Sequence, residues 1–187
     1  MSLYTTTSQT VGPYLHIGMT WLNSNNLVGE GVSGEPLTIS GCLLDGHGDP
    51  ISDGLIEIWQ ANAAGKYNHP EDTQDKAVET GFLGFGRIPT DAQGGFHFST
   101  IKPGRVPGPN DELQAPHLVV SVFGRGILKR LATRMYFAND AANTDDPILK
   151  LVPTQRHATL MAQAVGEGEL QWNIIVQGEN ETVFFDV

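Results

Sequence analysis

Short runs with apolar side chains at every second position set the strongest limit on the fold of this chain. In the first run Leu37, Ile39 and Leu43 alternate with Thr38 and Ser40, which is the period of a strand with one buried face. Similar apolar runs cover residues 54–60, 94–100, 117–123 and 131–137. Turn-forming Gly (22) and Pro (11) are spread between the runs. The sequence therefore predicts an all-β chain, a single-domain β-sandwich of about seven to eight strands with long loops.

The remaining segments predict one short helix and several connections. Pro153–Val165 is expected to be the helix, because Pro153 suits a first turn and Leu160, Met161 and Ala164 fall on one helical face. The segments 170–176 and 181–187 are expected to form a closing hairpin, and 61–84 a long loop. An ordered arm, turning at a Gly-Pro pair, precedes a polar loop. We divide the chain into an N-terminal arm and loop (1–36) and the β-sandwich (37–187).

The charge of the chain excludes some classes of partner. A formal charge of −10 disfavours nucleic acids and anionic membranes as ligands. No signal peptide, membrane-spanning run or intrachain disulfide is expected (Cys42 is the one cysteine), so the sequence predicts a soluble cytoplasmic protein. Arg125, Lys129, Arg130 and Arg134 cluster within ten residues. This cluster is either a solvated strand edge or partner contact, or a site for a small anion.

A series of short motifs, in a fixed order, carries a family resemblance over nearly the whole chain. The motifs are Ser8–Tyr14, Ile56–Ala63, Gly65–Tyr67, Gly81–Arg87, Thr90–Asp91, Thr100–Gly104, Ala115–His117, Arg134–Phe137 and Gly178–Phe185. In this order and spacing the chain resembles the intradiol ring-cleavage dioxygenases. The resemblance implies a β-sandwich and a reaction in which Fe(III) and O₂ open a catechol ring between its two hydroxyl-bearing carbons.

The iron ligands implied by the resemblance are only half present. The family binds Fe(III) through two Tyr and two His, because phenolate oxygen and imidazole suit ferric iron. Tyr67 and His117 match one position of each kind, whereas Val106 and Val119 stand at the other two. An isopropyl group has no lone pair for a metal. Gln114 also replaces the family's Arg. We therefore expect no metal on this chain and Fe(III) on a homologous partner.

The resemblance further implies an iron-free subunit in an αβ hetero-oligomer. The partner β chain would cleave 3,4-dihydroxybenzoate with O₂ to 3-carboxy-cis,cis-muconate, and this chain would complete the pocket. By resemblance Thr10, Gly12 and Pro13 on the arm line that pocket. Arg134 falls near it, where a guanidinium suits the substrate carboxylate. Trp59 matches a pocket tryptophan of the family, although a Trp on an apolar strand is more often part of the core.

Two other functions stay open from the sequence. One is a self-sufficient catechol-type intradiol dioxygenase with an altered metal site, in which His69 or His97 replaces a lost ligand. The other is a non-enzymatic β-sandwich binding module, because a fold alone does not imply activity.

Overall fold

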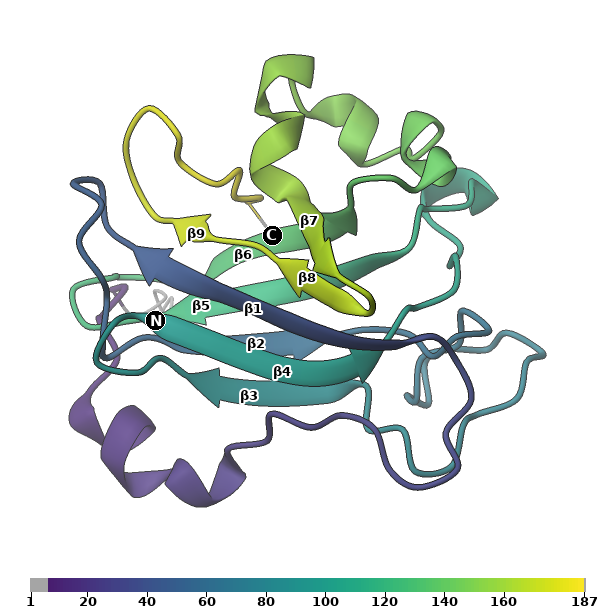
Figure 1. The fold of residues 1–187 in the computed structure, drawn as a ribbon, viewed down its shortest axis with the longest axis horizontal. Helices are drawn as coiled ribbons and strands as arrows, with labels where there is room; N and C mark the ends of the chain where they lie inside the picture. Colours follow the sequence, from purple (N-terminus) through teal and green to yellow (C-terminus); the bar gives the residue numbers. More distant parts are fainter. Residues whose placement is uncertain (1–6, 187) are drawn as a thin grey trace, which may run out of the picture.

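The computed structural model describes residues 7–186, and strands are its main regular secondary structure (Figure 1). The strands are β1 (Pro36–Leu44), β2 (Leu55–Trp59), β3 (Phe85–Pro89), β4 (Gly95–Ile101), β5 (His117–Phe123), β6 (Leu131–Phe137), β7 (Met161–Gly166), β8 (Glu169–Gln171) and β9 (Ile174–Ile175). The helical turns are η1 (Tyr14–Gly18), η2 (Thr20–Leu22), η3 (Pro109–Asp111), η4 (Ala141–Thr144), η5 (Leu149–Leu151) and η6 (Thr154–Leu160). Within residues 7–186 no helix is long and apolar enough to cross a membrane.

The strands form one sheet that folds over on itself. Its order is β3-β2-β5-β6-β7-β8-β1-β4, with β9 added to β1, and the two end strands β3 and β4 come into contact. The main core fills the space between the two halves. Its fully buried members include Ile39, Ile58, Phe98, Val120 and Met135. The predicted all-β sandwich is confirmed, and strand β3 was not expected from the sequence.

The predicted helix at Pro153–Val165 is present only in its first half, as a 3-10 helix, and its second half is a strand. Thr154–Leu160 forms the 3-10 turn η6, and the chain then continues directly into β7. Met161 pairs with Tyr136, and Ala162 pairs with Phe137, in a parallel ladder. Pairing with β6 thus overrides the local helical spacing, since residues far apart in sequence supply the hydrogen bonds.

The predicted closing hairpin does not form as a strand ladder. β8 and β9 both add in parallel to β1, and the segment after residue 180 meets β9 only at Thr182, whose N–H donates to the Ile175 carbonyl at 2.8 Å. The last described residues instead run along β6, where the Phe185 N–H donates to the Ala132 carbonyl at 2.8 Å. Part of the hairpin prediction, Val187, lies outside the described residues.

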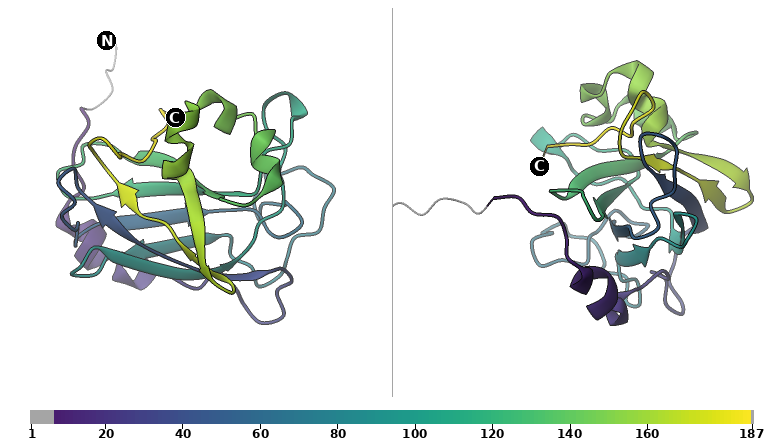
Figure 2. Two further views of the ribbon diagram at one scale, coloured as in Figure 1. Left: turned by 45° about the horizontal axis from the view of Figure 1, so that its top comes forward. Right: turned by 90° about the vertical axis from the view of Figure 1, so that its left-hand side faces the viewer.

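The arm packs at one end of the sheet, across from the long loops (Figures 1 and 2). Its helical turns η1 and η2 follow Pro13, where the sequence predicted only a turn. The Leu15 carbonyl accepts a hydrogen bond from Arg87 Nη2 at 3.1 Å. The Thr10 hydroxyl accepts from Gly126 N–H at 2.8 Å and donates to the Gly124 carbonyl at 3.4 Å. The arm is therefore tied to the β5–β6 turn.

Candidate functional site

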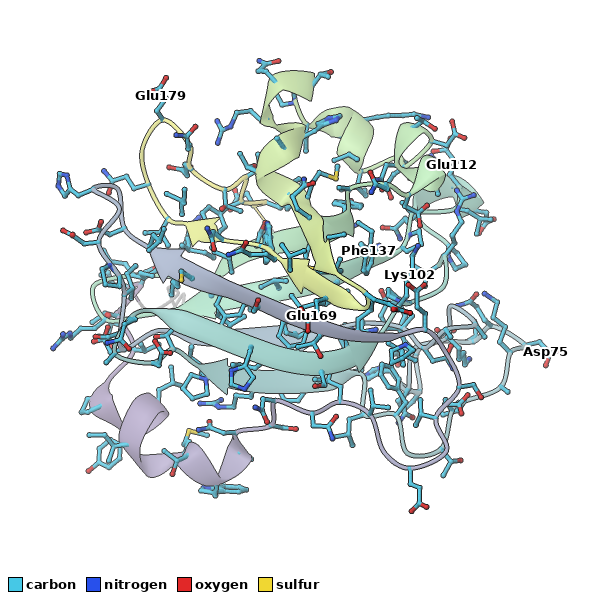
Figure 3. All side chains as sticks on the ribbon, in the orientation of Figure 1. Asp75, Lys102, Glu112, Phe137, Glu169 and Glu179 are labelled. Carbon is cyan, nitrogen blue, oxygen red and sulfur yellow. The ribbon has the colours of Figure 1, made fainter. Side chains whose placement is uncertain are left out.

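Two long loops meet beyond the other end of the sheet and form the walls of a cavity. They are the segments 60–84 and 102–116, whose outer parts carry Asp75 and Glu112 in Figure 3. The loops touch at Gly104, whose N–H donates to the Asn62 carbonyl at 2.9 Å. A side chain at Gly104 would lie within 2.6 Å of backbone atoms of residues 63 and 65. The glycine of the Lys-Pro-Gly motif is therefore required by this close approach.

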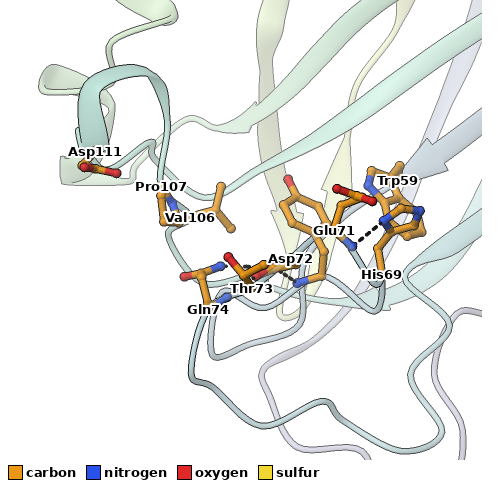
Figure 4. Close-up of a pocket in the computed structure, with 10 residues that line it drawn as sticks. Trp59, His69, Glu71, Asp72, Thr73, Gln74, Val106, Pro107 and Asp111 are labelled. Atoms are coloured by element: carbon orange, nitrogen blue, oxygen red, sulfur yellow. Dashed lines mark hydrogen bonds between the residues drawn. The ribbon is translucent and has the colours of Figure 1, made fainter.

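The cavity has a volume of about 640 Å³ and aromatic and aliphatic side chains on one side (Figure 4). Trp59, Tyr67 and Val106 contribute this apolar surface, while His69, residues 71–74 and Asp111 provide polar groups. Trp59 is only half-buried and faces the cavity, so it is a pocket residue and not part of the main core. Sites for small organic ligands commonly combine apolar walls with a few polar groups in this way.

A buried ion pair holds the loop that carries Tyr67. Lys66 and Asp72 are each 7% exposed at the side chain, and Lys66 Nζ lies 3.1 Å from Asp72 Oδ1. Lys66 Nζ also donates to the carbonyls of Asp72 and Gln74. Burial raises the pKa of Asp72, but N–H donors from Tyr67 and Gln74, with Lys66, outweigh it and lower that pKa to about 2. The position of Tyr67 is thus fixed by protein groups alone.

Tyr67 lies flat against Trp59. The ring centroids are 5.7 Å apart and the planes differ by 11°. Burial raises the pKa of the Tyr67 phenol, although the nearby Arg134 cation opposes the change. The phenol is therefore protonated at neutral pH and available as a hydrogen-bond donor.

The sheet itself provides the floor next to Trp59. Cross-strand pairing places Trp59, Val119 and Arg134 in one row over β2, β5 and β6. The flanking Ile58 and Val120 are buried in the core, so this row faces outward. Val119 is the smallest side chain of the row.

His117 lies two residues from Val119 on the same strand and face. Its Nδ1 is 2.8 Å from the Ala115 carbonyl, which makes Nδ1 the protonated nitrogen. Burial, assisted by the Arg134 cation, lowers the pKa of His117 to about 4. The imidazole is thus neutral at neutral pH, and Nε2 carries a lone pair.

Arg134 supplies a cation beside Gln114. Its Nη1 donates to Gln114 Oε1 at 2.5 Å and lies 3.5 Å from the Tyr136 hydroxyl. Gln114 is in turn held by a hydrogen bond from its Nε2 to the Pro107 carbonyl at 2.9 Å. A guanidinium on β6 thus approaches Gln114, the position that the resemblance assigned to an arginine.

Asp146, which the sequence analysis missed, anchors the segment before His117. Asp146 is fully buried and accepts hydrogen bonds from the backbone N–H groups of Ala115, Ile148 and Leu149 at 2.6–2.9 Å. It also accepts from the Tyr136 hydroxyl at 3.2 Å. Burial strongly raises the pKa of Tyr136, so its phenol stays protonated. No pattern around residue 146 distinguishes this carboxylate from the other acidic residues of the chain.

The side chains at the expected iron-ligand positions do not fit a ferric ion. Tyr67 and Val106 line the cavity, while His117 and Val119 lie on the adjacent strand β5. Two of the four are aliphatic. Among the described residues, 7–186, no three His, Cys, Asp or Glu side chains are grouped closely enough to hold a metal.

The two histidines considered as substitute ligands lie apart from each other. His69 lines the cavity, edge-on to Trp59 with ring centroids 6.3 Å apart. His97 is on β4 and its Nε2 is 3.4 Å from the Asn25 amide nitrogen. Only His69 is therefore near Tyr67.

The expected pocket residues of the arm lie away from this cavity. Thr10 is bonded to the turn after β5, whereas Arg134 pairs with Val119 near the start of β5. Gly12 and Pro13 are exposed. Within this chain the structure therefore does not bring Thr10, Gly12 and Pro13 together with Arg134.

Comparisons with known proteins agree with this geometry. A model of the family described as "Dioxygenase" matches residues 19–178. The protocatechuate 3,4-dioxygenase alpha chain of Burkholderia cepacia is 38% identical, covering 100% of this chain and 99% of that relative. The beta chain from the same organism is 37% identical over 80% of this chain and 67% of that relative. The dioxygenase domain of a carbohydrate-binding fusion protein from Streptomyces sp. SirexAA-E superposes with a TM-score of 0.62 at 26% identity, over 83% and 88% of the two chains. The chain therefore belongs to the intradiol ring-cleavage dioxygenase family, and over its full length it is similar to protocatechuate 3,4-dioxygenase alpha chains.

Proposed function

We propose that this chain is the iron-free α subunit of a protocatechuate 3,4-dioxygenase. A homologous β chain would hold Fe(III) and cleave 3,4-dihydroxybenzoate with O₂ to 3-carboxy-cis,cis-muconate. The single observation that carries the proposal is the replacement of two ligand positions by Val106 and Val119 in a chain that keeps the rest of the family fold. The full-length similarity to alpha chains supports it.

The composition of the arm supports a protein partner. No Asp, Glu, Lys or Arg precedes Glu30, although 17% of the chain is charged. The centres of protein interfaces are depleted of charge and enriched in aromatic residues. Tyr14, Ile17 and Trp21 are 82%, 70% and 77% exposed. All three belong to the short helical segments η1 and η2, so the arm presents a group of exposed apolar side chains.

The position of the arm supports a role at a neighbouring chain's pocket. The arm lies at the end of the sheet opposite this chain's own cavity (Figure 2). Residues of the arm that line a dioxygenase pocket would therefore line the pocket of another chain. Gly12 has open space around it and Pro13 is exposed, so both are free to face a ligand there. The Thr10 hydroxyl anchors the segment.

The test is coexpression with a homologue that keeps both Tyr and both His. We expect the two chains to copurify, with iron on the partner and oxygen uptake on 3,4-dihydroxybenzoate. Trp21→Ser is expected to break the complex, whereas Leu151→Ser, which removes an equally exposed side chain (77%) elsewhere, leaves it intact. Full iron loading and oxygen uptake by this chain alone would favour the self-sufficient dioxygenase. Failure to bind any such homologue would favour the non-enzymatic module.

A further inference from the structure

We propose that the cavity between the loops 60–84 and 102–116 is a binding site for a small organic cation, an ammonium group that carries apolar substituents. The cation would lie against the Trp59 ring, with the Glu71 carboxylate as its counter-charge. The inference uses only groups of this chain that line the cavity, so it does not depend on the existence or identity of the partner.

Aromatic rings in two orientations form one wall of the cavity. Trp59 lies parallel to Tyr67, whereas the His69 ring stands at 88° to Trp59 with the centroids 6.3 Å apart. All three side chains line the cavity. An ammonium group is attracted to the face of an aromatic ring within about 6 Å of the centroid, and Trp attracts it most strongly. This corner of rings is therefore suited to a cation.

Glu71 places a carboxylate next to these rings. Its backbone N–H donates to His69 Nδ1 at 3.2 Å, and Figure 4 shows Glu71 beside His69 and Trp59. Because Nδ1 accepts this bond, the His69 ring is neutral and does not repel a cation. Over residues 7–186 Glu71 takes part in no ion pair, so its charge is available to a ligand.

The charges of the lining favour a cation over an anion. Glu71, Asp72 and Asp111 line the cavity, whereas neither Lys nor Arg is among the described residues of the lining. Asp72 is paired with Lys66, which leaves the other two carboxylates without a basic partner. The Arg134 cation lies nearby but outside the lining. An anion in the cavity would therefore be repelled by two carboxylates, and a cation would be attracted by them.

The size of the cavity suits a small ligand. Its volume of about 640 Å³ is typical of sites for small organic molecules. Val106 and Pro107 also line it and provide an apolar surface for the substituents of the ammonium group. An inorganic cation would gain nothing from this surface, so an organic cation fits better.

The experiment is an NMR titration of the full-length, isotope-labelled chain, free of iron, with choline and with 3,3-dimethyl-1-butanol. The two compounds have the same shape, but carbon replaces the charged nitrogen in the alcohol. We expect choline to bind at one site per chain and to shift the indole N–H resonance of Trp59. The resonances of Trp21 and Trp172, which lie outside the lining, should stay unchanged. The alcohol should bind at least about fivefold more weakly, because it lacks the attraction to the ring and to the carboxylate.

A pair of glutamate variants tests the counter-charge. Glu71→Gln is expected to weaken choline binding about two- to fivefold, as for the loss of one exposed ion pair, and to leave binding of the alcohol unchanged. Glu179→Gln is the matched control, since Glu179 is exposed and lies across the molecule from the loop that carries Asp75 (Figure 3). At that distance its charge is screened, so the affinity for choline should stay at the wild-type value.

Replacement of tryptophan by 5-fluorotryptophan tests the ring directly. Fluorine withdraws electron density from the ring face and hardly changes its shape, so the affinity for choline should fall at least about twofold while that for the alcohol is unchanged. Trp59→Leu should lower the affinity for choline further, with the thermal unfolding midpoint reporting whether this variant is folded. The proposal is overturned if the wild-type chain does not bind choline, if the alcohol binds as tightly, if fluorination has no effect, or if the two glutamate variants behave alike.

Discussion

His117 makes the folding stability of this chain depend on pH in a way that can be isolated by one substitution. Burial and the Arg134 cation lower the pKa of His117 from 6.5 to about 4. Because the folded-state pKa lies below the unfolded one, the unfolded chain binds more protons between these values. Stability from this group is therefore present above the unfolded pKa and is lost as the pH falls towards the folded pKa.

The magnitude follows from the two pKa values. Between about pH 7 and about pH 5 the unfolded imidazole becomes charged while the folded one stays neutral, which costs about 2 kcal/mol of unfolding free energy. His117→Phe removes this titration. It also leaves the Ala115 carbonyl without its N–H donor, so we expect the variant to be about 1–3 kcal/mol less stable near neutral pH.

The assay is urea unfolding of wild-type and variant protein at several pH values. The two proteins are compared by how their free energies of unfolding change with pH. Carboxylates that both proteins contain contribute equally, so their effect cancels in the difference. His47→Gln, which changes a solvent-exposed side chain, should retain the wild-type pH dependence. Parallel pH profiles for wild type and His117→Phe would refute the assignment of His117 as a buried, neutral ring.

Three other variants test the structure. Asp146→Ala leaves three backbone N–H groups without an acceptor and should lower the unfolding free energy by about 3–5 kcal/mol in urea titrations, while the exposed Asp145→Ala should change it little. The double variant Val106→Tyr/Val119→His supplies the missing ligand types, so its iron content should rise towards one per chain and the protein should be visibly coloured. Metal analysis and absorbance measure this. An iron content no higher than that of the wild type or the single variants would contradict the ligand assignment. Thr10→Val removes both bonds between the arm and the β5–β6 turn, and should raise the KM of the proposed complex for 3,4-dihydroxybenzoate in oxygen-uptake assays. An unchanged KM would show that the anchoring of the arm does not affect the pocket.

The strands that were predicted from the sequence are those with a run of apolar side chains. The predicted runs at 54–60, 94–100, 117–123 and 131–137 agree with β2, β4, β5 and β6 to within a residue at each end. β3 was missed because Phe85–Pro89 contains Gly86 and Pro89 and shows no alternation. Its identity as a strand depends on pairing with β2.

The C-terminal predictions failed in part, for a related reason. Leu160, Met161 and Ala164 have helical spacing, yet residues 161 and 162 pair with β6. Likewise Ile174 pairs in parallel with Leu43, more than 100 residues earlier in the chain. A local sequence pattern does not predict such pairings, because the partner strand determines whether an apolar run forms a helix or a strand.

The candidate site was predictable in its ligand positions but not in its electrostatics. Tyr67, Val106, His117 and Val119 were identified by their order in the sequence, and the structure places them at or beside one cavity. The contact between Arg134 and Gln114 joins residues 20 positions apart on different elements. The sequence analysis noted Gln114 and Arg134 separately, and only the fold shows that the two side chains meet.

The hydrogen bonds around the cavity explain how its shape is held without a metal. The loop of Tyr67 is held by the Lys66–Asp72 pair and by Asn62, whose side-chain oxygen accepts from the Lys66 N–H at 2.9 Å. The segment before His117 is held by Asp146. None of these bonds involves the side-chain oxygen or nitrogen of Tyr67 or His117 that would face an iron. A buried polar group that loses its partners is costly, so these networks resist collapse of the loops whatever stands at residues 106 and 119. The residues that hold the shape of the cavity are therefore different from those at the expected metal-ligand positions, so the cavity keeps its shape with valine at residues 106 and 119.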